Sequence, residues 1–154
     1  MIPALIASLI LAQAPTPPGV DLLPFDPAKL EGLPRVECRV TEDGRAVTYT
    51  GVALATILDR GSKDAGTMPA LRSLSDSVLL VRGADGYQAA VSAAAAAMDP
   101  KGERYLLAVA RDGRPLAKGQ GPVRLIVPGD PKHVRWVREV ATIRLVRLNR
   151  LVGP

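Results

Sequence analysis

Cysteine, histidine and aromatic residues are scarce in this sequence: its 154 residues include one cysteine, one histidine and 3% aromatics. A lone cysteine, Cys38, has no partner within the chain, so no internal disulfide supports the fold. The same scarcity excludes a zinc site built from several cysteines and histidines, because only Cys38 and His133 are available. The core therefore has to be aliphatic, which suits the 47% apolar content and one modest domain.

Familiar catalytic motifs are absent as well. The sequence contains no G-x-S-x-G, H-E-x-x-H, Walker A or G-x-G-x-x-G pattern. The sequence therefore lacks the motifs that identify the common hydrolase, metalloprotease and nucleotide-binding folds. No spacing of the acidic residues indicates a paired-carboxylate site either.

Positive charge is concentrated near the C-terminus. Residues 111–150 carry ten arginines or lysines against three acids, whereas the formal net charge of the whole chain is +5. This excess favours an anionic partner, although a solvated cationic face is the alternative. Nucleic acid is not expected, because no aromatic residues are interleaved with the cations.

Residues 1–14 resemble an export signal. An apolar stretch over residues 2–12 is too short to span a bilayer comfortably, and it ends in Ala12-Gln13-Ala14, a small-x-small pattern. We expect cleavage there, no stable membrane span afterwards, and a periplasmic or secreted protein. The alternative is an uncleaved anchor, since no lysine or arginine precedes the apolar stretch.

Proline-rich residues 15–34 are expected to lie extended over the surface of a domain at residues 35–150. Two alternating segments flank Asp43-Gly44, a strong turn signal, and predict a hairpin over residues 35–50. Apolar residues at helical spacing then predict a short helix that ends at Gly61 as its C-cap.

The rest of the chain also favours strands. Two strands joined by a turn are predicted in SDSVLLVRGADGYQAAVS, and further strands in RYLLAVARDGRPL, VRLIVPG and EVATIRLVRL. The alanine-rich stretch before Pro100 predicts a helix. The whole pattern indicates an α+β fold with mixed β-sheets and short helices.

Four segments carry a resemblance to a known family. TYTGVALATIL, RGADGYQAAVS, LLAVARDGRPL and GPVRLIVPGDPKHVRWVREVATIRL follow one another in this order. Their order and spacing resemble the molybdopterin-binding domain of the sulfite oxidase family over roughly residues 35–148. The resemblance implies that fold in a small stand-alone form, and an oxidoreductase with molybdenum-molybdopterin as its cofactor.

The resemblance also implies a phosphate site in the loop that follows VPG. The expected contacts are Gly129, Lys132, His133, Arg135 and Arg138. A glycine-containing turn with cationic side chains is chemically suited to a phosphate. The alternative is that the arginines only solvate a strand edge. Trp136, the single tryptophan, is expected to anchor the core rather than to stack on a ligand.

Cys38 is the residue that the resemblance implies as molybdenum ligand, because family enzymes bind the metal through one cysteine thiolate. Its context lacks the family's ligand-loop pattern, and the alternation of Val36, Cys38 and Val40 also fits a small buried hydrophobic residue. Two functions follow. One is a molybdenum-pterin oxidoreductase. The other is a non-catalytic module that keeps the fold and binds a small anionic ligand or a redox partner.

Overall fold

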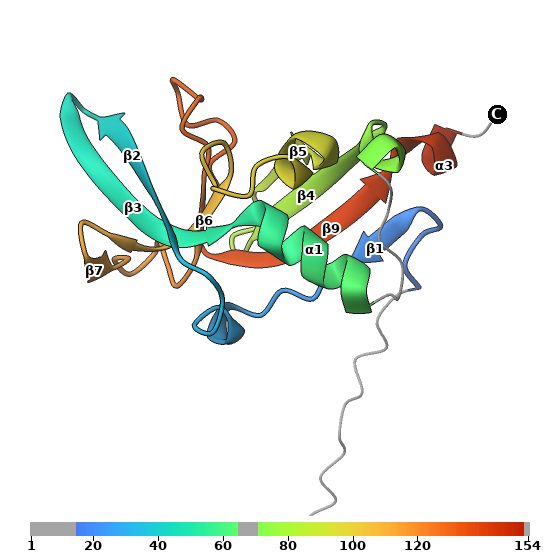
Figure 1. Ribbon diagram of the computed structural model, residues 1–154, viewed down its shortest axis with the longest axis horizontal. Helices are drawn as coiled ribbons and strands as arrows, with labels where there is room; N and C mark the ends of the chain where they lie inside the picture. Colours follow the sequence, from blue (N-terminus) through green and yellow to red (C-terminus); the bar gives the residue numbers. More distant parts are fainter. Residues whose placement is uncertain (1–14, 65–70, 153–154) are drawn as a thin grey trace, which may run out of the picture.

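The computed structural model describes residues 15–64 and 71–152 and contains two antiparallel β-sheets with short helices (Figure 1). The expected export signal at residues 1–14 lies outside the described residues. Within them, no helix is long and apolar enough to cross a membrane. The predicted α+β architecture of β-sheets with short helices is confirmed.

The first sheet begins with the predicted hairpin. β2 (Val36–Glu42) and β3 (Arg45–Ala53) pair in antiparallel fashion through the whole length of β2. Asp43 and Gly44 have φ values of 49° and 76°, the left-handed turn that an Asp-Gly pair favours. β6 (Leu106–Arg111) follows β3 in this sheet, and β7 (Arg114–Pro115) and β8 (Arg124–Ile126) both pair with β6. Figure 1 shows the β2–β3 hairpin projecting from the body of the molecule.

The second sheet has four strands in the order β1-β9-β4-β5. They are β1 (Val20–Leu22), β9 (Val140–Arg147), β4 (Ser77–Gly83) and β5 (Gln88–Ser92). β4 and β5 form the second predicted hairpin. The last predicted strand, whose buried face the sequence left open, turns Ile143 and Leu145 into the core.

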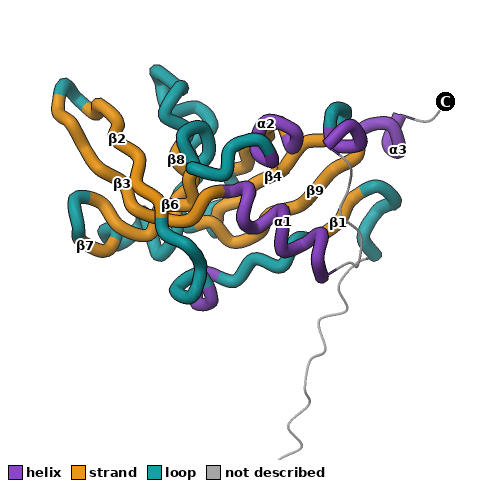
Figure 2. The backbone as a smooth tube through the Cα atoms, viewed as in Figure 1, coloured by secondary structure: helices purple, strands orange, loops and turns teal. Residues whose placement is uncertain are grey.

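Two α-helices lie over one face of the second sheet, α1 (Leu54–Asp64) and α2 (Ala93–Ala97), while α3 (Leu148–Val152) ends the described chain (Figure 2). Two short 3-10 helices, η1 (Pro27–Lys29) and η2 (Leu71–Leu74), complete the elements. The predicted stop of the first helix at Gly61 is wrong, because α1 continues to Asp64. A Cβ at Gly61 would lie 2.9 Å from Leu23 Cδ2, so this glycine permits close packing and does not cap the helix.

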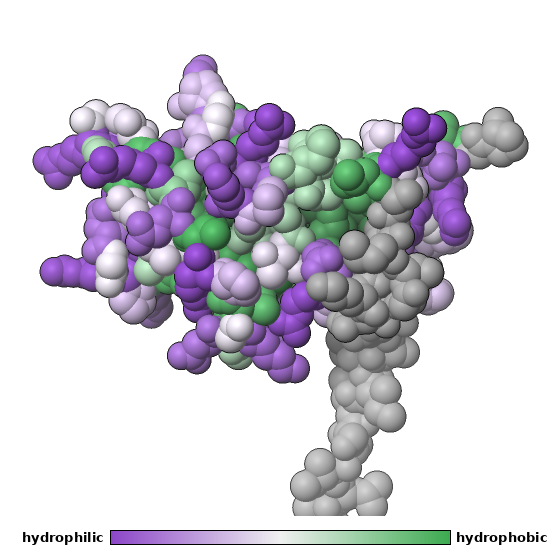
Figure 3. Space-filling model, in the orientation of Figure 1, coloured by the Kyte–Doolittle hydropathy of each residue, from purple (hydrophilic) through white to green (hydrophobic). Residues whose placement is uncertain are grey.

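The proline-rich lead-in is more than a surface covering. It supplies β1, which pairs with β9 along three residues, and Leu23 and Leu30 are buried in the core. The core is mostly aliphatic, as the composition requires, with Tyr49, Tyr105 and Trp136 as its large aromatic members. On the face shown in Figure 3, hydrophilic residues cover the β2–β3 hairpin, and hydrophobic patches gather toward α2.

Candidate functional site

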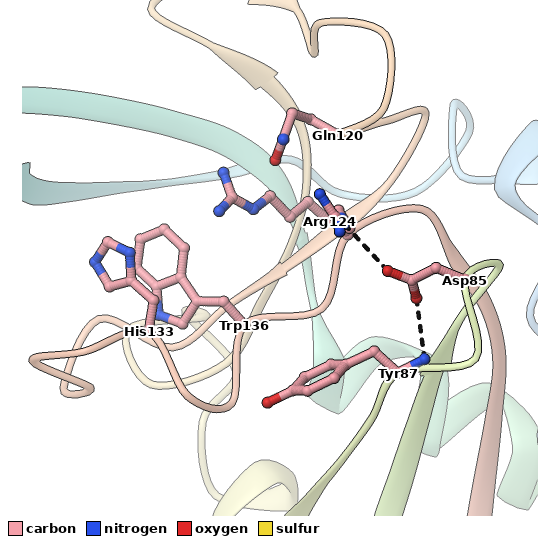
Figure 4. A pocket seen from close by; sticks show the side chains of 7 residues that line it. Asp85, Tyr87, Gln120, Arg124, His133 and Trp136 are labelled. Carbon is pink, nitrogen blue, oxygen red and sulfur yellow. Dashed lines mark hydrogen bonds and ion pairs between the residues drawn. The ribbon is translucent and has the colours of Figure 1, made fainter.

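A cationic pocket opens where three segments distant in sequence meet (Figure 4). Its volume is about 280 Å³. The β4–β5 turn, the segment leading into β8, and the loop between β8 and β9 supply its lining, which consists of Asp85, Tyr87, Gln120, Arg124, His133, Trp136 and Arg138. The lining contains two guanidinium groups and one carboxylate, so the pocket favours an anion.

Backbone hydrogen bonds hold these three segments together. The amide of Ala84 donates to the carbonyl of Glu139 at 2.9 Å, and the amide of Glu139 donates to the carbonyl of Gln120 at 3.0 Å. Gly83 allows the approach, because a Cβ there would lie 2.5 Å from the Arg138 carbonyl oxygen. The Tyr87 hydroxyl donates to the Val134 carbonyl across the same junction. The pocket walls are therefore fixed by the fold.

Trp136 lines the pocket and is only 6% exposed. Its indole Nε1 donates to the Val127 carbonyl at 2.7 Å, and Tyr49 meets the ring edge-on with centroids 5.9 Å apart. These contacts confirm the predicted role as a core anchor. One face of the indole carries the His133 imidazole, stacked at 3.7 Å between centroids (Figure 4). The stacking places the single histidine at the pocket wall.

Arg124 brings a positive charge into this pocket, and its Nη1 donates to the Tyr49 hydroxyl at 3.4 Å. It lies on β8 between buried Val123 and Leu125, with its guanidinium carbon 5.0 Å from the Trp136 ring centroid. Its Nε and the Gln120 Oε1 are buried side-chain atoms without a hydrogen-bond partner. Buried polar groups are rarely left unpaired, so this pair marks a place where a ligand or solvent atom belongs.

Arg138 is partly neutralised on the pocket rim. Its Nε donates to Asp85 Oδ2 at 3.1 Å. The backbone amide of Tyr87, followed by this Arg138 contact, lowers the pKa of the Asp85 carboxyl. Asp85 therefore stays ionised and competes with any anion for Arg138. Because the pair is exposed, solvent screens it and weakens that competition.

The structure does not bring the five predicted phosphate contacts together. His133 and Arg138 line the cationic pocket, whereas Gly129 and Arg135 line a second pocket with Tyr105 and Val127. Arg135 binds Asp130 through its guanidinium and its backbone amide, which closes the loop on itself. This contact lowers the pKa of the Asp130 carboxyl and raises that of Arg135. Lys132 is exposed and lines neither pocket.

Cys38 lies on β2, half-buried and packed against the core. Burial raises the pKa of its thiol, and the nearby carboxylates of Asp99 and Glu103 raise it further. The residue lines neither the cationic pocket nor the second one. Its role as a molybdenum ligand stays a prediction. Among the described residues, no group of three or more histidine, cysteine or acidic side chains could hold a metal ion by itself.

Sequence reasoning missed Gln120, Arg124, Asp85 and Tyr87. For Arg124 a signal was present, because a charged residue interrupts the apolar run Val123 to Val127 in a strand that is otherwise buried. Asp85 and Tyr87 stand in the D-G-Y segment that helps to define the resemblance. Nothing in the local sequence marks Gln120, whose position follows from the backbone bond to Glu139.

Comparison with known proteins identifies a family. A family model described as "Oxidoreductase molybdopterin binding domain" matches residues 37–149, which is most of the chain. No curated protein matches the chain at a significant level. The matched residues include every residue that lines the cationic pocket.

Proposed function

The chain belongs to the oxidoreductase molybdopterin binding domain family, with an α+β fold of the sulfite oxidase type, and we propose that its cationic pocket binds the phosphate-bearing part of a molybdopterin-type cofactor. The observation that carries this proposal is that the buried Arg124 Nε and the buried Gln120 Oε1, which belong to the lining of the same pocket, both lack a hydrogen-bond partner. A phosphate oxygen would accept from that guanidinium, and charge-assisted bonds of this kind are short and strong.

The chemistry of the pocket fits the anionic end of such a group. Arg124 would hold the phosphate, Arg138 would add charge at the rim, and Gln120 would be free to accept a hydrogen bond from a ring amine. The volume of about 280 Å³ lies at the lower end for ligand pockets, so part of a molecule of this size would remain at the mouth.

The residues of the pocket fit the molybdenum-bearing end of the cofactor less well than its phosphate end. When bound, molybdenum supplies redox chemistry, and the family description names oxidoreductases. Cys38, the one cysteine, does not line the pocket that would hold the phosphate. We therefore assign no electron-transfer step to this chain, and propose that it acts as an exported binding module.

Pterin content tests the binding proposal. The protein should be purified from its native cells, and the released pterin oxidised and measured by fluorescence. Arg124→Gln should reduce the bound pterin at least about fivefold, because one of two pocket guanidinium groups is lost. Arg114→Gln, an exposed arginine outside the pocket, is the matched control and should leave the content unchanged. Absence of pterin in the wild-type protein, while other molybdoenzymes of the same cells are loaded, would contradict the proposal.

Elemental analysis separates the two functional classes. Near-stoichiometric molybdenum that disappears in Cys38→Ser would establish a metal centre and an oxidoreductase. Pterin without molybdenum in both proteins would identify the binding module. Molybdenum retained in Cys38→Ser would remove Cys38 from the role of ligand.

A further inference from the structure

The four-stranded sheet has one buried face and one open face. Strand partners directly opposite each other share a face, and the odd-numbered partners Leu145, Leu79 and Val91 belong to the core beneath α1 and α2. Their even-numbered neighbours point the opposite way. Figures 1 and 2 show both helices on one side of this sheet.

Apolar side chains form the centre of the open face. Leu22 is 59% exposed, and Val146, although only 9% exposed, is not a member of the core cluster. The open face is defined by the even-numbered residues that are paired across the sheet, namely Val20, Leu22, Val78, Leu80, Arg82, Gln88, Ala90, Ser92, Thr142, Arg144 and Val146.

The charge of the open face has one sign. Arg144 stands between Leu22 and Leu80 in one cross-strand row, and Arg82 stands in the next row beside Thr142. Both arginines are exposed, and the open face contains no acidic residue. Among the described residues, neither guanidinium takes part in an ion pair. An occupant of this face must therefore supply both apolar surface and carboxylates.

We propose that the open face docks an amphipathic, acidic α-helix of a partner protein. Helices are the usual cover of a sheet face, and α1 and α2 cover the inner face of this same sheet. The four strands give the open face an area of about 300 Å². A helix about 10 Å wide covers about two adjacent strands, and Arg82 and Arg144 lie on the adjacent strands β4 and β9, so one helix reaches both guanidinium groups with its carboxylates.

A second copy of the chain fits the open face less well. Two copies packed face to face would bring arginines together with no acid between them. Like charges across an interface are unfavourable, so the arginines favour an acidic partner over self-association.

Site-specific crosslinking in the native cells tests this proposal. A photo-crosslinking amino acid replaces Ala90, which is exposed and lies directly opposite Leu80. We expect a crosslinked protein whose linked peptide is an acidic amphipathic helix. The same crosslinker at exposed Lys118, away from this sheet, should not capture that helix.

Charge-reversal variants measure how much the two arginines contribute to the affinity for the helix. A synthetic peptide of the linked segment should bind the full chain, and the double variant Arg82→Glu with Arg144→Glu should bind it at least about tenfold more weakly. Arg114→Glu with Lys118→Glu changes the charge equally outside the open face and should keep the affinity. Thermal melts verify that both double variants fold. No crosslink from position 90, a crosslink to a second copy or to lipid, or a linked peptide without acidic residues would each overturn the proposal.

Discussion

Asp99 is a buried residue whose carboxylate holds the loop between α2 and β6 in place. It is 6% exposed, and its two oxygens accept the backbone amides of Glu103, Arg104 and Tyr105 at 2.9 to 3.0 Å. These bonds shape the connection from α2 to β6. We expect Asp99→Ala to lower the free energy of unfolding by about 3 kcal/mol, because three amides lose a charged acceptor. Urea denaturation measures the loss.

An exposed aspartate provides the comparison for Asp99. Asp26 caps η1 and accepts a single backbone amide, from Ala28. Asp26→Ala should cost about 1 kcal/mol or less. Equal losses in the two variants would show that the three amides at Asp99 find other acceptors.

Tyr49 makes stability fall at high pH. Burial, and then the bond from its hydroxyl to Glu42 at 2.6 Å, raise the pKa of Tyr49 to about 12. An unfolded tyrosine titrates near 10, so the unfolded chain loses its proton first. This contribution is fully present below about pH 10 and is lost as pH rises toward 12. The loss amounts to about 2 kcal/mol.

Urea unfolding between pH 9 and pH 12 checks this dependence on Tyr49. Tyr49→Phe has no phenol to ionise and should show a shallower decline than the wild-type protein. Parallel declines in the two proteins would assign the alkaline loss of stability to other groups.

Strands and hairpins could be predicted because their signals are local. Alternation in β2 and β3, and the Asp43-Gly44 turn between them, depend on residues within a few positions of one another. The end of α1 could not be predicted, because Gly61 serves a contact with the distant Leu23. β1 could not be predicted either, since its partner β9 lies more than 100 residues away in the sequence.

Gly83 sets how closely the β4–β5 hairpin approaches the loop that holds Trp136. An added Cβ would lie 2.5 Å from the Arg138 carbonyl oxygen, and a backbone atom cannot move aside cheaply. We expect Gly83→Ala to lower the free energy of unfolding by about 2 kcal/mol and to weaken binding in the pocket. Gly32→Ala is the control, because a Cβ there meets nothing within 4 Å.

Thermal melts and titration with inorganic phosphate measure both effects of Gly83→Ala. If Gly83→Ala changes neither the stability nor the phosphate affinity, the β4–β5 hairpin and the loop that holds Trp136 can move apart without disturbing the pocket, which would contradict this prediction.

The pocket illustrates how far sequence reasoning reaches across the molecule. The cationic loop was found, and His133 and Arg138 do line the pocket. The sequence does not predict which cationic side chain of the loop enters which pocket, because this placement depends on how the loop folds around Trp136. Asp130 binds the Arg135 guanidinium within the loop, and Arg135 does not line the cationic pocket. The closeness of these two residues in the sequence does not by itself predict this ion pair. Arg124 joins the pocket only because β8 is placed beside that loop.

The whole domain depends on residues that precede the segment matched by its family. Leu23 and Leu30 are 7% and 2% exposed, and the amide of Leu23 donates to the Ile143 carbonyl at 2.9 Å. A chain of residues 35–154 loses these two leucines and β1 with its three-residue pairing. Each buried leucine contributes about 2 kcal/mol or more, which together is a large share of the 5–15 kcal/mol typical of domains.

We therefore expect the chain of residues 35–154 to lack a cooperative thermal transition, whereas residues 15–154 keep one. Two point variants separate core burial from simple shortening. Leu30→Ala should cost about 3 kcal/mol, and Leu22→Ala, at a side chain 59% exposed, about 0.5 kcal/mol. Circular dichroism melts measure all four proteins. A cooperative transition in the shortened chain, within a few degrees of the longer one, would show that the sheets close their core without the lead-in.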